Sequence, residues 1–222
     1  MLTPRKRITK KDLKEDKLVT FYVNAQEWIE GHARLLTTVA VAVLVIIVGT
    51  YFYTTNRSKS KVTASAELAK AVRLYEQNDF NNAVSLLGQI VESHGSTGSG
   101  KLARYYLANA LYETNEYSLA QEHFRRFARD FGGDDHLIAS AHAGVAACLE
   151  QQDQFAEAAK KYESTTKQFP KAPLASRYLL RAARCYSLAG NSEKAEQLYD
   201  KLITDYPDSA ERNEALLLSA LE

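Results

Sequence analysis

Several residue types that shape small folds are scarce in this chain of 222 residues. Its two cysteines, Cys148 and Cys185, are too few to form a disulfide framework. Four prolines and ten glycines leave room for long, uninterrupted elements of secondary structure. The formal net charge of +1 provides no overall field toward a polyanion, so no nucleic-acid partner is expected.

Constellations that carry chemistry are also missing from the sequence. The five histidines form no pair at metal-ligand spacing with carboxylates or cysteines, so no metal site is expected. The stretch GSTGSG at 95–100 lacks the Lys-Ser/Thr pair of a phosphate loop and is interpreted as a flexible connector. Without a nucleophile motif, we expect no enzyme, no catalytic residues and no cofactor.

A run of nineteen uncharged, mostly apolar residues extends from Leu35 to Tyr53. A helix rises about 1.5 Å per residue, so this run suits a hydrocarbon core of roughly 30 Å. It predicts a transmembrane helix at 34–54, with Tyr51, Phe52 and Tyr53 in the interfacial aromatic belt. A cleaved signal peptide is the main alternative, against which the thirty-four preceding residues argue. A buried core helix is the second alternative.

The segments before this run suggest how the chain meets the membrane. Residues 1–17 form a basic tail, and 18–33 have apolar residues on one helical stripe, with Trp28 expected in the headgroup layer. Contact with a partner and a plain helical run-in are the alternatives for this stripe. Residues 1–34 carry eight Lys and Arg, against five in 54–75, so the N-terminus is predicted to be cytoplasmic.

An internal period organises the chain after residue 62. Alanines recur at spacings of 37, 38 and 37 residues, each preceded three places earlier by an aromatic residue or serine. Five places before each alanine stands an Asn, Asp or Gly, the types that best tolerate the left-handed conformation of a tight turn. The alanines are Ala83, Ala120, Ala158 and Ala195, and the turn residues are Asn78, Asn115, Asp153 and Gly190.

These positions predict helical hairpins, the last two closed by Pro170 and Pro207. Cys148 and Cys185 share one position in consecutive repeats, where a small core residue is expected. After a linker at 55–63, the predicted repeats lie near 64–97, 101–133, 139–171 and 176–208, with a capping helix at 209–222. The predicted fold class is all-α: a transmembrane helix, then an α-solenoid of about four hairpins plus the cap over 64–222.

The pattern of the third hairpin resembles the tetratricopeptide repeat, and the likeness extends over about residues 64–207. It rests on Ala146, Leu149, Phe155, Ala158, Tyr162 and Pro170. His142 and Glu67 stand where that family often has tryptophan, and Ser192 replaces the usual turn aromatic. The resemblance implies binding of other proteins or of unfolded polypeptide segments.

The family's ligand-contacting positions can be carried onto this sequence. They give Tyr105, Tyr106, Asn109 and Tyr112 in the second repeat, and Arg177, Leu180, Arg181 and Arg184 in the fourth. Tyrosines beside an arginine stripe suit an extended polypeptide. The alternative is a solvated basic face with tyrosines that pack between repeats. Only Asn109 matches the family's carboxylate clamp, so recognition of a C-terminal carboxylate is not supported.

The order of basic tail, amphipathic helix, anchor and repeats resembles the ancillary subunit of the bacterial SecYEG translocon (the YfgM-like family). That resemblance implies a scaffold in the bacterial inner membrane, with periplasmic repeats that hand exported polypeptides to chaperones. A structural adaptor in cell-envelope assembly or cell division is the alternative, and an import receptor with cytosolic repeats is a third hypothesis. Packing on the fourth repeat is expected for the C-terminal leucines, with a homodimer contact as the alternative: Leu216, Leu217, Leu218 and Leu221.

Overall fold

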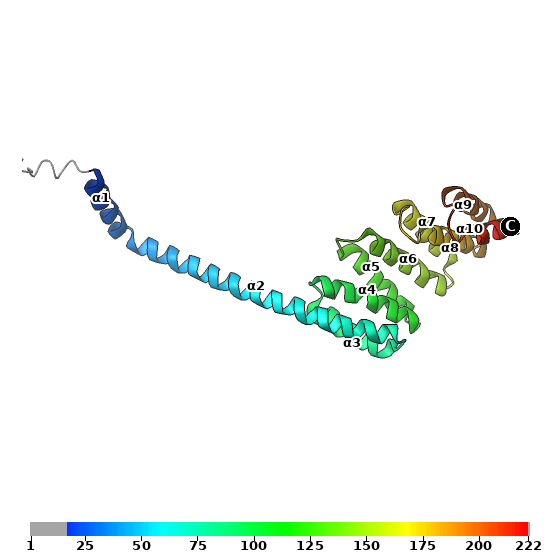
Figure 1. Cartoon of the computed structure of the whole chain (residues 1–222), viewed down its shortest axis with the longest axis horizontal. Coiled ribbons are helices and arrows are strands. Elements are labelled where there is room, and N and C mark those ends of the chain that lie inside the picture. Colours follow the sequence, from blue (N-terminus) through cyan, green and yellow to red (C-terminus); the bar gives the residue numbers. More distant parts are fainter. Residues whose placement is uncertain (1–16, 222) are drawn as a thin grey trace, which may run out of the picture. The chain divides into compact units, whose positions relative to one another are not determined.

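The computed structural model describes residues 17–221, except for the side chains of residues 17, 18, 53 and 56–59. This part of the chain contains ten α-helices and no β-strand, which confirms the predicted all-α class (Figure 1). It divides into two compact units, with the boundary between Arg57 and Ser58. The helices are α1 (Lys17–Gly31), α2 (Ala33–Glu76), α3 (Phe80–His94), α4 (Gly98–Glu113), α5 (Tyr117–Asp130), α6 (Asp135–Gln151), α7 (Phe155–Gln168), α8 (Ala175–Leu188), α9 (Ser192–Asp205) and α10 (Arg212–Ser219).

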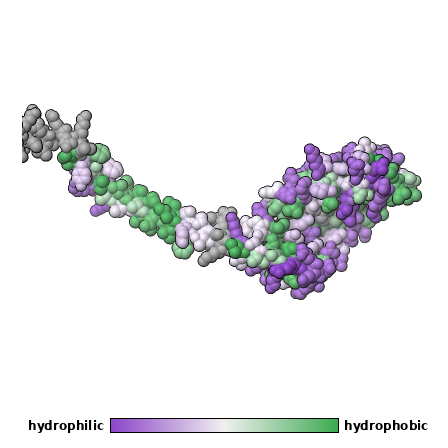
Figure 2. Space-filling view, viewed as in Figure 1, coloured by the Kyte–Doolittle hydropathy of each residue, from purple (hydrophilic) through white to green (hydrophobic). Residues whose placement is uncertain are grey.

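The first unit holds α1 and the apolar part of α2. Ala33–Phe52 is twenty residues long and has no buried residue, and Figure 2 shows much of it as a hydrophobic band. Its length and composition suit a membrane span or a signal sequence. Trp28 is half exposed and stacks on His32, while Tyr51 and Phe52 are largely exposed. The basic residues 1–16 and the side chain of Tyr53 lie outside the described part.

The linker predicted at 55–63 is not a separate segment, because these residues lie inside α2. The physical reason is local: TNRSKSKVT contains neither proline nor glycine, so nothing in it interrupts the backbone hydrogen bonds of the helix. The C-terminal part of α2 supplies the first helix of the first hairpin. There Ser60 Oγ lies 2.8 Å from His94 Nδ1, at the end of α3.

The second unit stacks α2–α3, α4–α5, α6–α7 and α8–α9 as hairpins, and α10 packs on α9 (Figure 1). One continuous core runs through all of them. The four period-defining alanines are fully buried, which lets paired helices approach closely, and the apolar residue four places on is buried beside each. Those residues are Leu87, Phe124, Tyr162 and Tyr199.

The four turn residues adopt the left-handed conformation that their types predicted. The φ angles are 61° at Asn78, 65° at Asn115, 58° at Asp153 and 78° at Gly190. In every hairpin the next N–H donates to a carbonyl five residues back, as from Glu116 to Leu111 at 2.8 Å. These bonds satisfy carbonyl groups that would otherwise be orphaned where the first helix ends.

The stretch 95–100 is not a plain flexible connector. Thr97 caps α4, since its hydroxyl accepts a hydrogen bond from the Gly100 N–H at 2.9 Å, and α4 therefore begins at Gly98 rather than near Lys101. A Cβ on Gly100 would meet the His94 carbonyl oxygen at 1.9 Å. The glycine is thus required by the close approach of α4 to the end of α3.

Candidate protein-binding groove

The first helices of the second, third and fourth hairpins, α4, α6 and α8, share one open hollow of about 300 Å³. We call it the tyrosine groove. Its lining is a mixture of aromatic, small and charged side chains, which come mainly from these three helices. They are Tyr105, Asn109, Tyr112, Glu113, Phe124, Ser140, Ala143, Gly144, Ala147, Tyr162, Leu174, Arg177, Tyr178 and Arg181.

The aromatic surface of the groove comes mainly from Tyr105, Tyr112 and Tyr178. The first two are partly buried and the third is largely buried. The Tyr105 ring lies 5.2 Å from Phe127, and the Tyr178 hydroxyl is 3.2 Å from Ser140 Oγ. Burial raises the pKa of Tyr105, Tyr112 and Tyr178 above the ordinary value, so their hydroxyls stay neutral at physiological pH. These side chains offer apolar area together with groups that can donate or accept a hydrogen bond.

Close packing between α5 and α6 shapes the floor of the groove. Gly144 lies directly over the Phe124 ring, and a Cβ on it would meet ring atoms at 2.7 Å. Phe124 is itself almost completely buried. The missing side chain therefore lets the floor remain open beside a rigid aromatic ring.

Arg181 is held by the third repeat rather than being a free cation. Its guanidinium lies 3.2 Å from the Glu150 carboxylate and 3.3 Å from the Tyr162 hydroxyl, which also donates to Glu150 at 3.0 Å. Burial and the neighbouring Glu150 raise the pKa of Tyr162, so its hydroxyl remains a donor. This triad ties α8 to α6 and α7, and it leaves Arg181 about half exposed in the groove.

The other two arginines of the stripe are also paired. Arg177 lies 3.2 Å from Glu211 and Arg184 lies 3.3 Å from Glu214, so both reach toward the C-terminal cap. A ligand carboxylate would have to compete with these internal partners, which lowers the net gain from each arginine. The stripe is exposed as expected, but its charges are already balanced.

The structure brings together five of the eight residues predicted to form the groove: Tyr105, Asn109, Tyr112, Arg177 and Arg181. Leu180 is only 4% exposed and belongs to the core, so the prediction that it faces a ligand is wrong. The family position falls on the buried side of α8, within the continuous core. Tyr106 packs on Tyr75, with ring centroids 5.9 Å apart, and Arg184 lies outside the lining.

Sequence reasoning missed the groove residues Tyr178, Ser140 and Leu174. Tyr178 is adjacent to Arg177 in the sequence and is not one of the family's ligand-contacting positions. It reaches the groove because α6 and α8 are neighbours along the solenoid. Periodicity within one helix gives no signal for such a contact between repeats.

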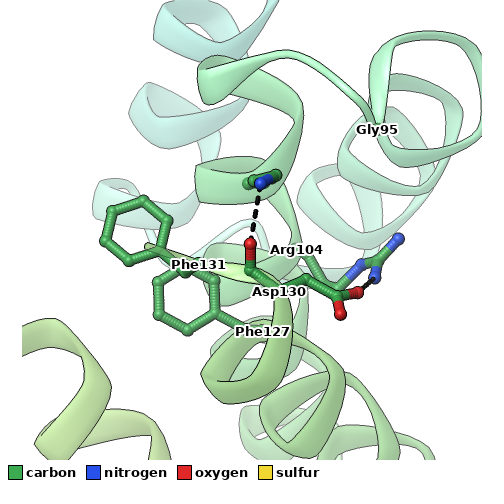
Figure 3. A pocket seen from close by; sticks show the side chains of 6 residues that line it. Gly95, Arg104, Phe127, Asp130 and Phe131 are labelled. Atoms are coloured by element: carbon green, nitrogen blue, oxygen red, sulfur yellow. Dashed lines mark hydrogen bonds and ion pairs between the residues drawn. The ribbon is translucent and has the colours of Figure 1, made fainter. Parts of the chain in front are cut away.

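A second hollow, of about 360 Å³, lies where α5 ends (Figure 3). Lys101 Nζ donates to the Asp130 carbonyl oxygen at 2.7 Å, and Arg104 lies 3.3 Å from the Asp130 carboxylate. The stacked rings of Phe127 and Phe131, 4.6 Å apart, form its other side. Both cations lie at the C-terminal end of α5, where the helix dipole is negative. Stabilising that helix end accounts for the arrangement without a ligand.

Two thiols are the remaining reactive side chains of the repeats. Cys148 and Cys185 are both free and fully buried, and burial raises the pKa of each thiol to about 12. They are core residues, as expected. Among residues 17–221, no cluster of three or more histidine, cysteine or carboxylate side chains is arranged to hold a metal.

Known proteins share this architecture. TPR-like repeats of a kinesin light chain protein from Podosopora anserina have a TM-score of 0.58 and 17% identity, covering 71% of this chain and 83% of that one. The apo form of RapI has a TM-score of 0.64 and 14% identity, covering 73% of this chain and 48% of that one. These likenesses concern the fold alone, and no curated protein sequence matches. The family model described as a tetratricopeptide repeat-like domain matches residues 26–216, and the chain belongs to that family.

Proposed function

We propose that this protein is a membrane-anchored scaffold that binds an extended polypeptide segment in the tyrosine groove. The observation that carries the proposal is the groove itself: three neutral tyrosines from α4 and α8 around one open hollow, with Asn109 and Arg181 at its sides. An extended chain presents apolar side chains and backbone polar groups together. Aromatic surface with interspersed hydroxyls, amide and guanidinium matches that mixture.

The internal pairing of the arginines refines the chemistry of the ligand. Because Arg177 and Arg181 already have carboxylate partners, affinity would come mainly from the tyrosines and not from net charge. We therefore expect only weak dependence of binding on salt and little preference for acidic segments in this groove.

We further propose that the scaffold works beside the Sec translocon in a bacterial inner membrane, receiving exported polypeptides or handing them to periplasmic chaperones. The unburied apolar run Ala33–Phe52 supports an anchor, and the basic residues before it support a cytoplasmic N-terminus with periplasmic repeats. The order of segments along the chain supports the translocon in particular.

Site-specific photo-crosslinking tests both parts of the proposal. A benzoylphenylalanine at Asn109 lies in the groove, whereas one at the exposed Glu196 on α9 lies outside it and is the matched control. In cells, the Asn109 probe should crosslink to exported polypeptides while translocon subunits co-purify in mild detergent. Equal crosslinking from both sites would remove the groove from the proposal.

A structural adaptor in envelope assembly or cell division is the second candidate, and one observation favours it. Leu217 and Leu221 at the C-terminal end are 69% and 81% exposed, on a surface suited to a folded partner or a second copy of the chain. Leu217→Asp should then abolish partner capture or dimerisation, while Tyr112→Ala should leave it intact. An import receptor would instead require cytosolic repeats, and labelling of Glu196→Cys with a membrane-impermeant reagent distinguishes the two topologies.

A further inference from the structure

A third, larger hollow of about 690 Å³ is lined by residues of α5, α6 and α7. We call it the basic hollow. Its walls carry five basic side chains, and its floor is apolar. The basic residues are Arg125, Arg129, His142, Lys160 and Lys161, and the floor is formed by Ala128, Val145 and Leu149.

The charges in the basic hollow are not balanced as they are in the tyrosine groove. Within the described part of the chain, Arg125, Lys160 and Lys161 form no ion pair with a carboxylate, although Glu157 belongs to the same lining. Arg129 pairs with Asp130, its neighbour along the chain. Like charges gathered around a hollow repel one another, and a bound anion would relieve that repulsion.

The contact between Lys161 and His142 shows how crowded these cations are. Lys161 Nζ lies 2.7 Å from His142 Nδ1, an arrangement that requires a neutral imidazole accepting from the ammonium. Burial and the nearby Lys161 lower the pKa of His142, and burial and Arg125 lower the pKa of Lys161. A carboxylate bound here would stabilise the charged form of both groups.

We propose that the basic hollow is a second docking site, which binds an acidic polypeptide segment carrying at least one apolar side chain. Charge complementarity favours carboxylates for the walls. The partly exposed Ala128, with the buried Val145 and Leu149 in the same lining, favours an apolar side chain at the floor, which a free inorganic anion would not supply. Because its chemistry and its lining residues differ from those of the tyrosine groove, the site stands whether or not the groove binds client segments.

The full chain in uncharged detergent micelles is suitable for the test, with fluorescence anisotropy as the readout. The probe is a short, fluorescein-labelled, glutamate-rich peptide with one leucine, and its control carries glutamine at every glutamate. We expect the glutamate peptide to bind at least about tenfold more tightly than the glutamine peptide, with affinity falling as salt is raised. Equal affinity for the two peptides would overturn the proposal without any variant.

A matched pair of charge reversals locates the binding. Arg125→Glu with Lys160→Glu changes two exposed, unpaired cations of the hollow and should weaken binding about tenfold or more. Lys70→Glu with Lys171→Glu makes the same change in net charge at exposed positions outside the hollow and should have little effect. Equal losses in both double variants would show a general charge effect and reject the site.

A competition experiment in the same micelles distinguishes binding of an acidic peptide from binding of an anionic lipid headgroup. Phosphatidylglycerol added to the micelles should compete only weakly with the glutamate peptide, because it lacks the carboxylate-and-leucine combination. Strong competition, lost in Arg125→Glu with Lys160→Glu, would assign the hollow to lipid instead. Failure of the proposed groove would appear separately, as equal crosslinking from Asn109 and Glu196.

Discussion

Arg181 of α8 and Glu150 of α6 lie 3.2 Å apart and join the third and fourth repeats. Both side chains are partly exposed, at 44% and 24%, so the pair is only moderately shielded from solvent. Tyr162 bonds to both members and raises the cost of breaking the arrangement.

Reversing the charge of Arg181 should therefore lower the stability of the fold as well as alter the groove. Arg181→Glu sets two carboxylates side by side and is expected to cost about 1–2 kcal/mol of unfolding free energy. Urea unfolding followed by circular dichroism measures this cost. Adding Glu150→Lys should restore most of the loss, and a double variant no more stable than Arg181→Glu would contradict an ion pair between these residues.

The left-handed turns provide a second prediction. Asn115 has φ of 65°, so Asn115→Ala should cost about 1 kcal/mol, whereas Asn115→Gly should be neutral within a few tenths. Gly190→Ala, at φ of 78°, should cost about 1–2 kcal/mol. Thermal unfolding of the three variants would show this order, and equal midpoints for the alanine and glycine variants of Asn115 would argue against backbone strain.

Two glycines within helices should respond oppositely to alanine. A Cβ on Gly100 would collide with the His94 carbonyl oxygen, so Gly100→Ala should destabilise by about 3 kcal/mol or more. Gly88, in the middle of α3, has no atom within 4 Å of the place that a Cβ would occupy, so Gly88→Ala should stabilise by about 0.5–1 kcal/mol. Unfolding midpoints on opposite sides of the parent protein are the expected result.

Two partly buried histidines predict a fall in stability at mildly acidic pH. Burial and Arg104 lower the pKa of His123, whose Nδ1 is buried without a partner, and burial and Lys161 lower that of His142. The folded state therefore binds fewer protons than the unfolded state, in which histidine titrates near about 6.5. The stability is present above that pH and is lost as pH falls through the lowered pKa values.

Charged groups around each histidine could also contribute to the pH dependence, so a variant without the two histidines is the control. Arg104, Glu122 and Arg126 act on His123, and the walls of the basic hollow, Glu157 included, surround His142. Replacing both histidines with glutamine should flatten the stability profile between about pH 7 and pH 5, above the range in which carboxylates titrate. An unchanged slope in that double variant would assign the acid sensitivity to other groups.

The sequence by itself determined the hairpins and their turns. A left-handed turn next to a buried alanine uses residue types that few other positions demand, so Asn78, Asn115, Asp153 and Gly190 marked all four turns. The apolar run of α2 was equally clear from the sequence, because nineteen consecutive uncharged residues are typical of a membrane span or a signal sequence. Local conformation and hydrophobic period suffice for such features, since both are encoded within a few adjacent residues.

The stacking of the repeats decided everything that depends on neighbours distant in sequence. It buried Leu180, brought Tyr178 and Ser140 into one groove, and gave each arginine of α8 a glutamate from another helix or from the segment before α10. Within the part of the chain that the structure describes, it also left Arg125, Lys160 and Lys161 facing one hollow without a carboxylate partner. Pairing and burial of this kind depend on how one helix crosses the next, and a period along the chain fixes the face of a helix but not what lies opposite it.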